Sequence, residues 1–539
     1  MLTTFSEEYV SVMRKMFRDY VMRHDDAKKR REMFCCLCHY NSQLCLRPIT
    51  QGPCEKRILI ELMNCKELFP SVEDKKYFLK YALDKPSLEM IKLLEEGNLK
   101  IHEVKLEDGQ SALHYLAEVI YAKIYETMHE GNLKVLTLKI MDYFLESPEK
   151  NYQDNLGYTY LHGACMSGNV SAVNLLLSQG VDVNLDTYTC SPLHIAAQYR
   201  HADVVEILLT HGANPNQRDA EKSTPLHALA RLCLCQCTDC EKFCDERKPV
   251  DKLVQMLIDH GADIEAQNCH GYTPLGLSVC RFDLELTRTL LKHGAKIDNL
   301  NENKIFNMTF TPLELKNYPL TLNIIEMAHL LKSAGYNLSL QARLRMMKYW
   351  LKIRGNDTDH LIGEHSCEQY VLINIEHKID IHRIYGLYIT QEAEDFLHQK
   401  CKELRNVCPS DYHRFYPQEA IDDLEAQVER TKNIMLSENV SLYQICQMSY
   451  SKGYSLIKGM KNWRLPAMDD ISCTYVNIIA KRHLANVLIR THLERLVADF
   501  FMTDHCNLNL PYLACLKIAE HMSDEDLFRL CRQTGENHL

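Results

Sequence analysis

Five short stretches of this chain carry nearly the same phrase, and this repetition constrains the fold more than any other feature. The copies stand at residues 109–114, 157–162, 191–194, 224–227 and 271–275. Leu161, Leu193 and Leu226 at the centre of three copies are 32 and 33 residues apart. A Ser/Thr-Pro-Leu-His phrase that returns at this period is typical of a solenoid of stacked helix pairs.

Each phrase is expected to begin a helix, because a hydroxyl residue caps the first turn and proline at the first helical position gives up no needed hydrogen bond. A second phrase, ending in glycine, follows at residues 172–180, 204–212, 253–261 and 286–294. Its leucines and valines predict a second helix with an apolar stripe. Gly212 predicts a left-handed C-cap for that helix. A single helix pair cannot bury its stripe, so neighbouring pairs must stack.

The array extends beyond the clear copies. Residues 87–97 have the pattern of a second helix in a lead-in unit, and Thr311 begins a degraded unit that ends near Gly335. Terminal units of a solenoid are expected to be atypical. We therefore predict about seven units between residues 75 and 340.

Both phrases resemble the ankyrin repeat. The resemblance implies an array that binds a target protein on its concave face and hairpin tips. Aromatic character favours the tyrosines there, although each of these positions has the alternative of being a neutral surface residue. The expected target contacts are Tyr158, Tyr188, Cys190, Gln198, Tyr199, Cys269, His270 and Tyr272.

Composition narrows the classes of function. The net charge of −10 over 539 residues argues against a general nucleic-acid binder. No apolar run reaches the ~18 residues that a membrane span needs, and the charged first twenty residues hold no signal-peptide core. We therefore expect a cytoplasmic protein with no membrane partner, whose 23 cysteines are mostly free thiols.

Neither an enzyme nor a cofactor is expected. No cysteine or histidine lies in a recognised nucleophile context, and the chain has no glycine-rich phosphate loop. One insertion does contain a cysteine cluster in which two members have the spacing of zinc ligands, but the second pair that a zinc site needs is missing. A loop without metal is the favoured interpretation of Cys233, Cys235, Cys237, Cys240 and Cys244.

The N-terminal segment, residues 1–74, has a helical pattern and is expected to cap the array. Its basic run at residues 28–31 resembles a nuclear-import patch. Acidic neighbours favour a solvated helix face instead, and a nuclear location stays the alternative.

The C-terminal tail carries the second informative motif. Leu510-Pro511 is followed by aliphatic residues eight and twelve positions after the leucine, and by Asp-Leu at sixteen and seventeen. This spacing resembles the opening of an F-box, and Ser523 with Asp526 resembles a capping box for a following helix. The resemblance implies that a Skp-type linker protein binds Leu510, Pro511, Leu513, Ile518, Met522, Asp526 and Leu527.

An F-box opening after an ankyrin array resembles the PRANC domain of poxvirus, parasitoid-wasp and Wolbachia-type proteins. The charged stretch 422–432 and the segment 439–445 add weaker support. The sequence thus predicts an all-α chain in four parts: a helical cap at 1–74, an ankyrin array at 75–340, a helical connector at 341–419 and a PRANC or F-box-like domain at 420–539.

This resemblance implies a substrate-recruiting adaptor of a cullin–RING ubiquitin ligase, acting in an interaction between host and parasite. The adaptor would do no bond chemistry, because holding both partners on one scaffold raises the local concentration of the ubiquitin-loaded enzyme at the target. The alternative is a plain ankyrin protein that sequesters a signalling or transcription partner, with the tail as a cap.

Overall fold

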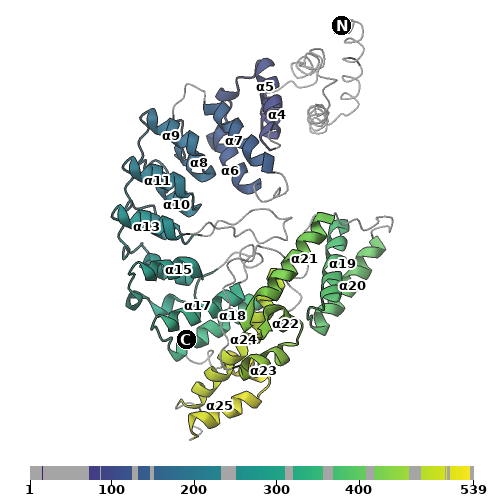
Figure 1. Cartoon of the computed structure of the whole chain (residues 1–539). Coiled ribbons are helices and arrows are strands. Elements are labelled where there is room, and N and C mark those ends of the chain that lie inside the picture. Colours follow the sequence, from purple (N-terminus) through teal and green to yellow (C-terminus); the bar gives the residue numbers. More distant parts are fainter. Residues whose placement is uncertain are drawn as a thin grey trace. The chain divides into compact units, whose positions relative to one another are not determined.

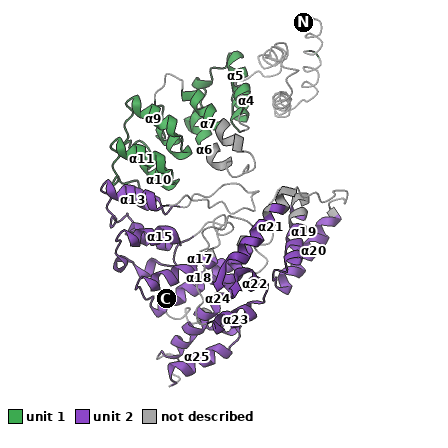
Figure 2. Cartoon of the chain, in the orientation of Figure 1, with its two compact units in different colours: residues 1–220 green, residues 221–539 purple. Residues whose placement is uncertain are grey.

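The computed structural model describes most of the chain after the N-terminal segment. Its described residues are Lys15 and 72–84, 87–123, 131–145, 151–231, 250–309, 320–355, 368–407, 418–460, 475–503, 506 and 510–533. The predicted cap at 1–74 and the cysteine-rich insertion lie almost wholly outside them. The chain divides into two compact units, residues 1–220 and residues 221–539 (Figure 2).

The first unit is built from helix pairs whose members lie side by side, as Figure 1 shows. Its helices are α4 (Val72–Asp84), α5 (Leu88–Glu96), α6 (Ala112–Lys123), α7 (Gly131–Leu145), α8 (Tyr160–Ser167), α9 (Val170–Ser178), α10 (Pro192–Gln198) and α11 (Ala202–Thr210). Each short inner helix contacts the next one, α6 with α8 and α8 with α10. The predicted lead-in helix is confirmed as α5, with Ser87 as its N-cap.

The pair α10–α11 shows how the phrases fold. Ser191 caps α10 and Pro192 occupies its first turn, as the sequence predicts. Leu193 of α10 and Val205 and Leu208 of α11 are at most 1% exposed, so the predicted apolar stripe is buried. Gly212 has a φ of 86°, the left-handed conformation expected after such a helix.

Gly157 combines two constraints at one hairpin tip. Its φ is +84°, and a Cβ placed there would lie 1.8 Å from the Thr187 carbonyl oxygen. Gly180 has a φ of +82°, but a Cβ there would meet no atom within 4 Å. An alanine at either position would adopt a strained left-handed backbone, but only an alanine at Gly157 would also clash with a neighbouring atom.

We expect Gly157→Ala to destabilise the chain by about 2 kcal/mol, because the alanine adds a clash with the next tip to the left-handed strain. Gly180→Ala should cost about 1 kcal/mol from strain alone. Urea unfolding followed by circular dichroism compares the two. Equal decreases in the free energy of unfolding would show that the tip at Gly157 rearranges and avoids the clash.

The second unit continues with repeat helices and then longer ones (Figure 1). The former are α12 (Pro225–Ala228), α13 (Asp251–Asp259), α14 (Pro274–Cys280), α15 (Leu284–Lys292) and α17 (Leu320–Ser333). The latter are α18 (Leu340–Arg354), α19 (Glu368–Tyr385), α20 (Gln391–Val407), α21 (Gln418–Asn433), α22 (Leu442–Cys446), α23 (Tyr450–Gly459), α24 (Tyr475–Phe501), α25 (Tyr512–His521) and α26 (Asp524–Gln533).

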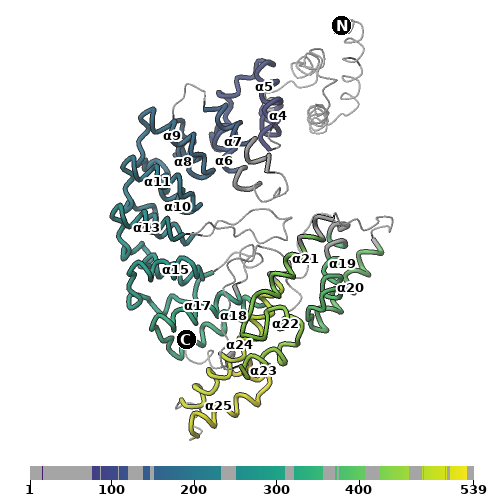
Figure 3. Tube along the Cα trace, in the orientation of Figure 1, coloured from purple at the N-terminus to yellow at the C-terminus, as the bar shows by residue number. Residues whose placement is uncertain are grey.

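Helix α24 organises this unit. It contacts α17, α18, α21, α22, α23, α25 and α26, and Figure 3 shows α17, α18, α22 and α23 close to it along the Cα trace. Leu484, Leu493 and Val497 of α24 are at most 1% exposed. The last repeat helices and the C-terminal helices therefore share one apolar core.

The all-α solenoid predicted from the sequence is confirmed, with one small addition. Residues Met435–Ser437 (β1) and Val440–Ser441 (β2) form a short antiparallel hairpin between α21 and α22. The predicted boundaries at residues 75, 340 and 420 stay predictions.

Candidate protein-binding surfaces

A histidine at the end of the repeated phrase ties a repeat to the next tip in two of the described repeats. The backbone N–H of Thr159 donates to His162 Nδ1 at 3.2 Å, so this nitrogen is the acceptor. His162 Nε2 therefore carries the proton and donates to the Cys190 carbonyl oxygen of the next tip at 3.2 Å. His227 makes the same bond in the second unit, to the Tyr272 carbonyl oxygen at 2.8 Å. The phrase thus positions the tips on which target contacts were predicted.

Burial keeps His162 and His114 neutral. Desolvation lowers the pKa of His162 to about 4, although its bond to the Cys190 carbonyl opposes the shift. His114 in the first copy behaves alike: desolvation, and then the charge of Lys105, lowers its pKa to about 4. The hydrogen bonds of these histidines require a neutral imidazole, because a proton on Nδ1 would face a backbone N–H.

Four predicted target contacts lie together in the first unit. Tyr188, Cys190, Gln198 and Tyr199 are half-buried at a tip and at the end of α10. The Tyr188 ring packs edge-on against Tyr158, with centroids 5.1 Å apart. These four side chains can be reached by a partner, and their role as target contacts stays a prediction.

The prediction that Tyr158 contacts the target is wrong. Its side chain is 4% exposed, because it is packed between the rings of His114, His162 and Tyr188. It therefore supports the tip from beneath and does not offer a contact surface. Burial raises its pKa first, and the nearby Tyr199 and Glu118 add to the shift.

Sequence reasoning missed two carboxylates beside these tyrosines. Asp154 is buried and accepts the backbone N–H groups of Leu156 and Tyr158, each at 2.9 Å. Desolvation raises the pKa of Glu118, the Gln110 hydrogen bond lowers it, and the charge of Asp154 raises it further. Glu118 follows the weakest copy of the phrase, so no repeat signal singled it out. Glu118 is exposed and Asp154 is buried, and both negative charges act on the half-buried Tyr188.

The other three predicted contacts belong to the second unit. Cys269 and His270 are exposed at the tip before α14, and Tyr272 is half-buried beside them. Lys304 Nζ lies 4.7 Å from the centre of the Tyr272 ring. The predicted residues therefore form two groups, one on each unit.

Helix α25 presents the predicted F-box-like motif with its apolar side outward. Leu513 is 73% exposed, and Leu510, Tyr512 and Ile518 are between 37% and 40% exposed. The opposite side of the helix is buried, since Cys515 and Ala519 are 0% exposed. Exposed apolar side chains on an otherwise packed helix form a candidate interaction surface. We call Leu510, Pro511, Tyr512, Leu513 and Ile518 the α25 face.

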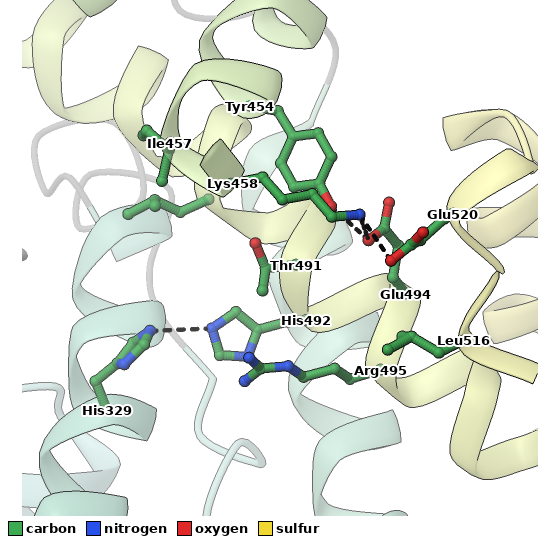
Figure 4. Close-up of a pocket in the computed structure, with 11 residues that line it drawn as sticks. His329, Tyr454, Ile457, Lys458, Thr491, His492, Glu494, Arg495, Leu516 and Glu520 are labelled. Atoms are coloured by element: carbon green, nitrogen blue, oxygen red, sulfur yellow. Dashed lines mark hydrogen bonds and ion pairs between the residues drawn. The ribbon is translucent and has the colours of Figure 1, made fainter. Parts of the chain in front are cut away.

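Charged residues hold this helix in place, as the close-up in Figure 4 shows. Lys458 of α23 pairs with Glu520 of α25 at 2.9 Å and with the buried Glu494 of α24 at 3.3 Å. Arg490 of α24 pairs with Glu494 at 3.1 Å and with Asp524 at the start of α26. Arg490 also donates to the Met522 carbonyl oxygen at 2.8 Å, which fixes the turn between α25 and α26.

We expect Arg490→Met to destabilise the second unit by about 2 kcal/mol, because it keeps the volume of the side chain and removes charged bonds next to a buried carboxylate. The control is Arg529→Met on α26, whose partners are on the surface; it should cost at most about 0.5 kcal/mol. Urea unfolding measures both. Equal losses would mean that the Arg490 network contributes no more than a surface pair.

The predicted role of Leu527 is wrong. This side chain is 0% exposed, because α26 packs against α18 and α24. The neighbouring Phe528 stacks on Trp350 of α18 with ring centroids 6.2 Å apart. Asp526 is exposed and receives the predicted capping contact, its N–H donating to Ser523 Oγ at 3.1 Å. Met522 is half-buried.

The described residues contain no group of three or more histidine, cysteine or acidic side chains that could hold a metal. The cysteine cluster at 233–244 lies outside the described part of the chain. Across the described helices, none has the length and apolar character required to cross a membrane.

Comparisons with known proteins bear on the repeats. Residues 129–219 match the family described as "Ankyrin repeats (3 copies)". Alpha-latrotoxin-Lhe1a of Latrodectus hesperus is 39% identical over 94 residues, which is 17% of this chain and 7% of the toxin. An ankyrin repeat protein of fowlpox virus is 30% identical over 151 residues, 27% of this chain and 39% of the viral protein.

Among solved structures, the human ASB11 ankyrin repeat domain is 21% identical with a TM-score of 0.32, covering 44% of this chain and 92% of that domain. The chain thus spans well under half the length of the two relatives above. The family match at residues 129–219 includes the copies of the phrase at 157–162 and 191–194, and repeat arrays of this kind offer extended concave surfaces for binding. Residues 129–219 are therefore ankyrin repeats.

Proposed function

We propose that this chain is a substrate-recruiting adaptor of a cullin–RING ubiquitin ligase. Its ankyrin repeats bind the target, and the α25 face binds a Skp-type linker protein. The observation that carries the proposal is the exposure of Leu513, Ile518, Leu510 and Tyr512 on a helix whose other side is fully packed. The PRANC-like spacing of the tail adds support from the sequence.

The packing of α26 within the chain limits which residues of the tail a linker protein could contact. Leu527 and Phe528 are occupied within the chain, so the linker would meet α25 and its N-terminal Leu-Pro turn. The carboxylates of Glu525 and Asp526 are exposed in the first turn of α26, the helix that follows α25. A partner that fits offers an apolar groove for the α25 face with polar or basic groups toward these carboxylates.

The target contacts are proposed at Tyr188, Cys190, Gln198 and Tyr199 on the first unit and at Cys269, His270 and Tyr272 on the second. Tyrosine is enriched at binding hot spots because its ring buries a large area at little entropic cost. The exposed carboxylate of Glu118 near Tyr188 favours a target segment that carries lysine or arginine near an apolar patch.

The alternative is a plain ankyrin protein that sequesters its target. Capture of a purified Skp-type linker by the intact chain discriminates the two functions. The ligase adaptor should capture the linker, and capture should fall after Leu510→Ala combined with Pro511→Ala. Absence of capture, or capture that is unchanged in this variant, would leave target sequestration as the function.

A further inference from the structure

Hydrogen bonds join the hairpin tips of the first unit into a continuous row. The Asn155 N–H donates to the Asp108 carbonyl oxygen of the preceding tip at 3.1 Å. The Thr187 hydroxyl of the following tip donates to the Gly157 carbonyl oxygen at 2.8 Å. Each tip is thus fixed against its neighbour, so a partner that binds along this row meets a preformed surface and does not have to order it.

The central tip presents an apolar side chain that no target prediction included. Leu156 is 61% exposed, whereas Leu175 on α9 is 40% exposed. The backbone of Leu156 is held in place, because its N–H donates to the buried Asp154 carboxylate at 2.9 Å and Gly157, with a φ of +84°, turns the chain directly after it. A partner can therefore cover this leucine without ordering a loop.

Two carboxylates flank Leu156 along the row. Asp108 belongs to the preceding tip and Asp186 to the following one, and both are exposed. Neither carboxylate forms an ion pair or a side-chain hydrogen bond with a described residue. Each is available to a basic group of a partner. We call Asp108, Leu156, Asp186 and the half-buried Tyr188 the tip row.

The composition of these repeats indicates the same sign of charge. Residues 151–220 contain no lysine, two arginines and six acidic residues. Arg200 is 1% exposed, so Arg218 is the single arginine on the surface of this stretch. A surface with this excess of acidic groups attracts a basic segment and disfavours an acidic one.

An apolar side chain between two available carboxylates fits a ligand with the opposite pattern of charge. An acidic segment would place like charges opposite Asp108 and Asp186. We propose that the tip row binds a segment of the target in which an apolar side chain packs on Leu156 and a lysine or arginine on either side pairs with the two aspartates. The proposal rests on the target-binding part of the proposed function and does not involve α25.

The stacking of the repeats sets the spacing within that segment. Helices α6, α8 and α10 of successive repeats are in contact, and packed helices lie about 8–10 Å apart. The tips of Asp108 and Asp186 are two repeats apart, which corresponds to about 16–20 Å. An extended chain covers about 3.3 Å per residue, so the two basic residues should be about five to six positions apart with the apolar residue midway.

The test uses the full chain and three fluorescent peptides, with binding measured by fluorescence anisotropy. The first peptide has a leucine midway between two lysines at this spacing, in a glycine and serine background. The second has serine in place of the leucine, and the third has glutamates in place of the lysines. The first peptide should bind at least about tenfold more tightly than either of the others. If the second peptide binds as tightly as the first, only net charge attracts them and the proposal is overturned.

Leu156→Ser should weaken binding of the first peptide about tenfold, and Asp186→Asn should weaken it about threefold. The matched controls in the same unit are Leu175→Ser on α9 and Asp203→Asn in the first turn of α11, which should bind like the parent chain. The melting temperature of each variant shows that it is folded. Leu156→Ser that binds like Leu175→Ser would contradict the proposal.

The ligase role and the tip row can fail separately. Leu513→Glu on α25 should lose linker capture and keep peptide binding. If the linker is captured but the first peptide does not bind, this target segment is wrong and the adaptor role stands. If the peptide binds but the linker is not captured, the adaptor role is wrong and the tip row stands.

Discussion

Leu513→Glu is expected to weaken capture of a Skp-type linker at least about a hundredfold while the chain stays folded. Leu513 is the most exposed apolar residue of the α25 face. In a complex it would lie against an apolar groove, where an unpaired carboxylate is costly. In the free chain the same carboxylate stays in water, so the free energy of unfolding should change by less than about 0.5 kcal/mol.

The matched control is Ile384→Glu. Ile384 is 68% exposed at the end of α19, so the two variants make the same apolar-to-acidic change at equally accessible helical positions. Linker capture, measured by surface plasmon resonance on both full-length variants, should be lost only with Leu513→Glu. If Leu513→Glu binds like the parent chain, α25 is not the docking helix and the ligase proposal fails.

Acid should destabilise this chain before its carboxylates are neutralised. Desolvation is the leading cause that lowers the pKa of His114, His162 and His483 to about 4. An unfolded histidine has a pKa near 6.5, so between pH 6.5 and 4 the unfolded chain binds more protons than the folded chain. Stability is therefore complete above about pH 6.5 and is lost as the pH falls toward 4.

The expected loss between about pH 7.5 and 5 is roughly 2 kcal/mol for each of these histidines. Urea unfolding at the two pH values measures it. His162→Gln should reduce the loss by about 2 kcal/mol, because glutamine keeps the capping acceptor and does not titrate. His211→Gln at an exposed position should leave the loss unchanged. If the free energy of unfolding falls equally with pH in both variants, the buried His162 does not contribute to acid sensitivity.

The repeat units could be predicted from the sequence because their signals are local. Capping residues, proline positions and C-cap glycines act within one helix, so the boundaries of α10 and α11 follow from a short stretch of residues. Helix α25 was predicted for the same reason. The short hairpin β1–β2 was not predicted, because five residues carry no period that distinguishes a strand from a turn.

Burial at the two candidate surfaces could not be predicted with the same success. Tyr158 and Tyr188 are both tyrosines at repeat tips, yet only Tyr158 is enclosed by rings from neighbouring repeats. The spacing of the motif puts Leu527 at an aliphatic position, but this spacing would be the same whether the side chain faced a partner or packed within its own chain. The cavity lined by α17, α23, α24 and α25 brings together residues that are far apart in the sequence.

The shared core of the second unit limits how the tail can be separated from the repeats. Trp350 of α18 is fully buried, with its indole N–H donating to the Thr321 carbonyl oxygen at 3.1 Å and Phe528 stacked on its ring. A truncation that ends after α18 would expose this tryptophan and the α17 surface that α24 covers. An isolated tail would expose the complementary surface. The tail therefore cannot be moved to another protein without the last repeat helices, because they share its core.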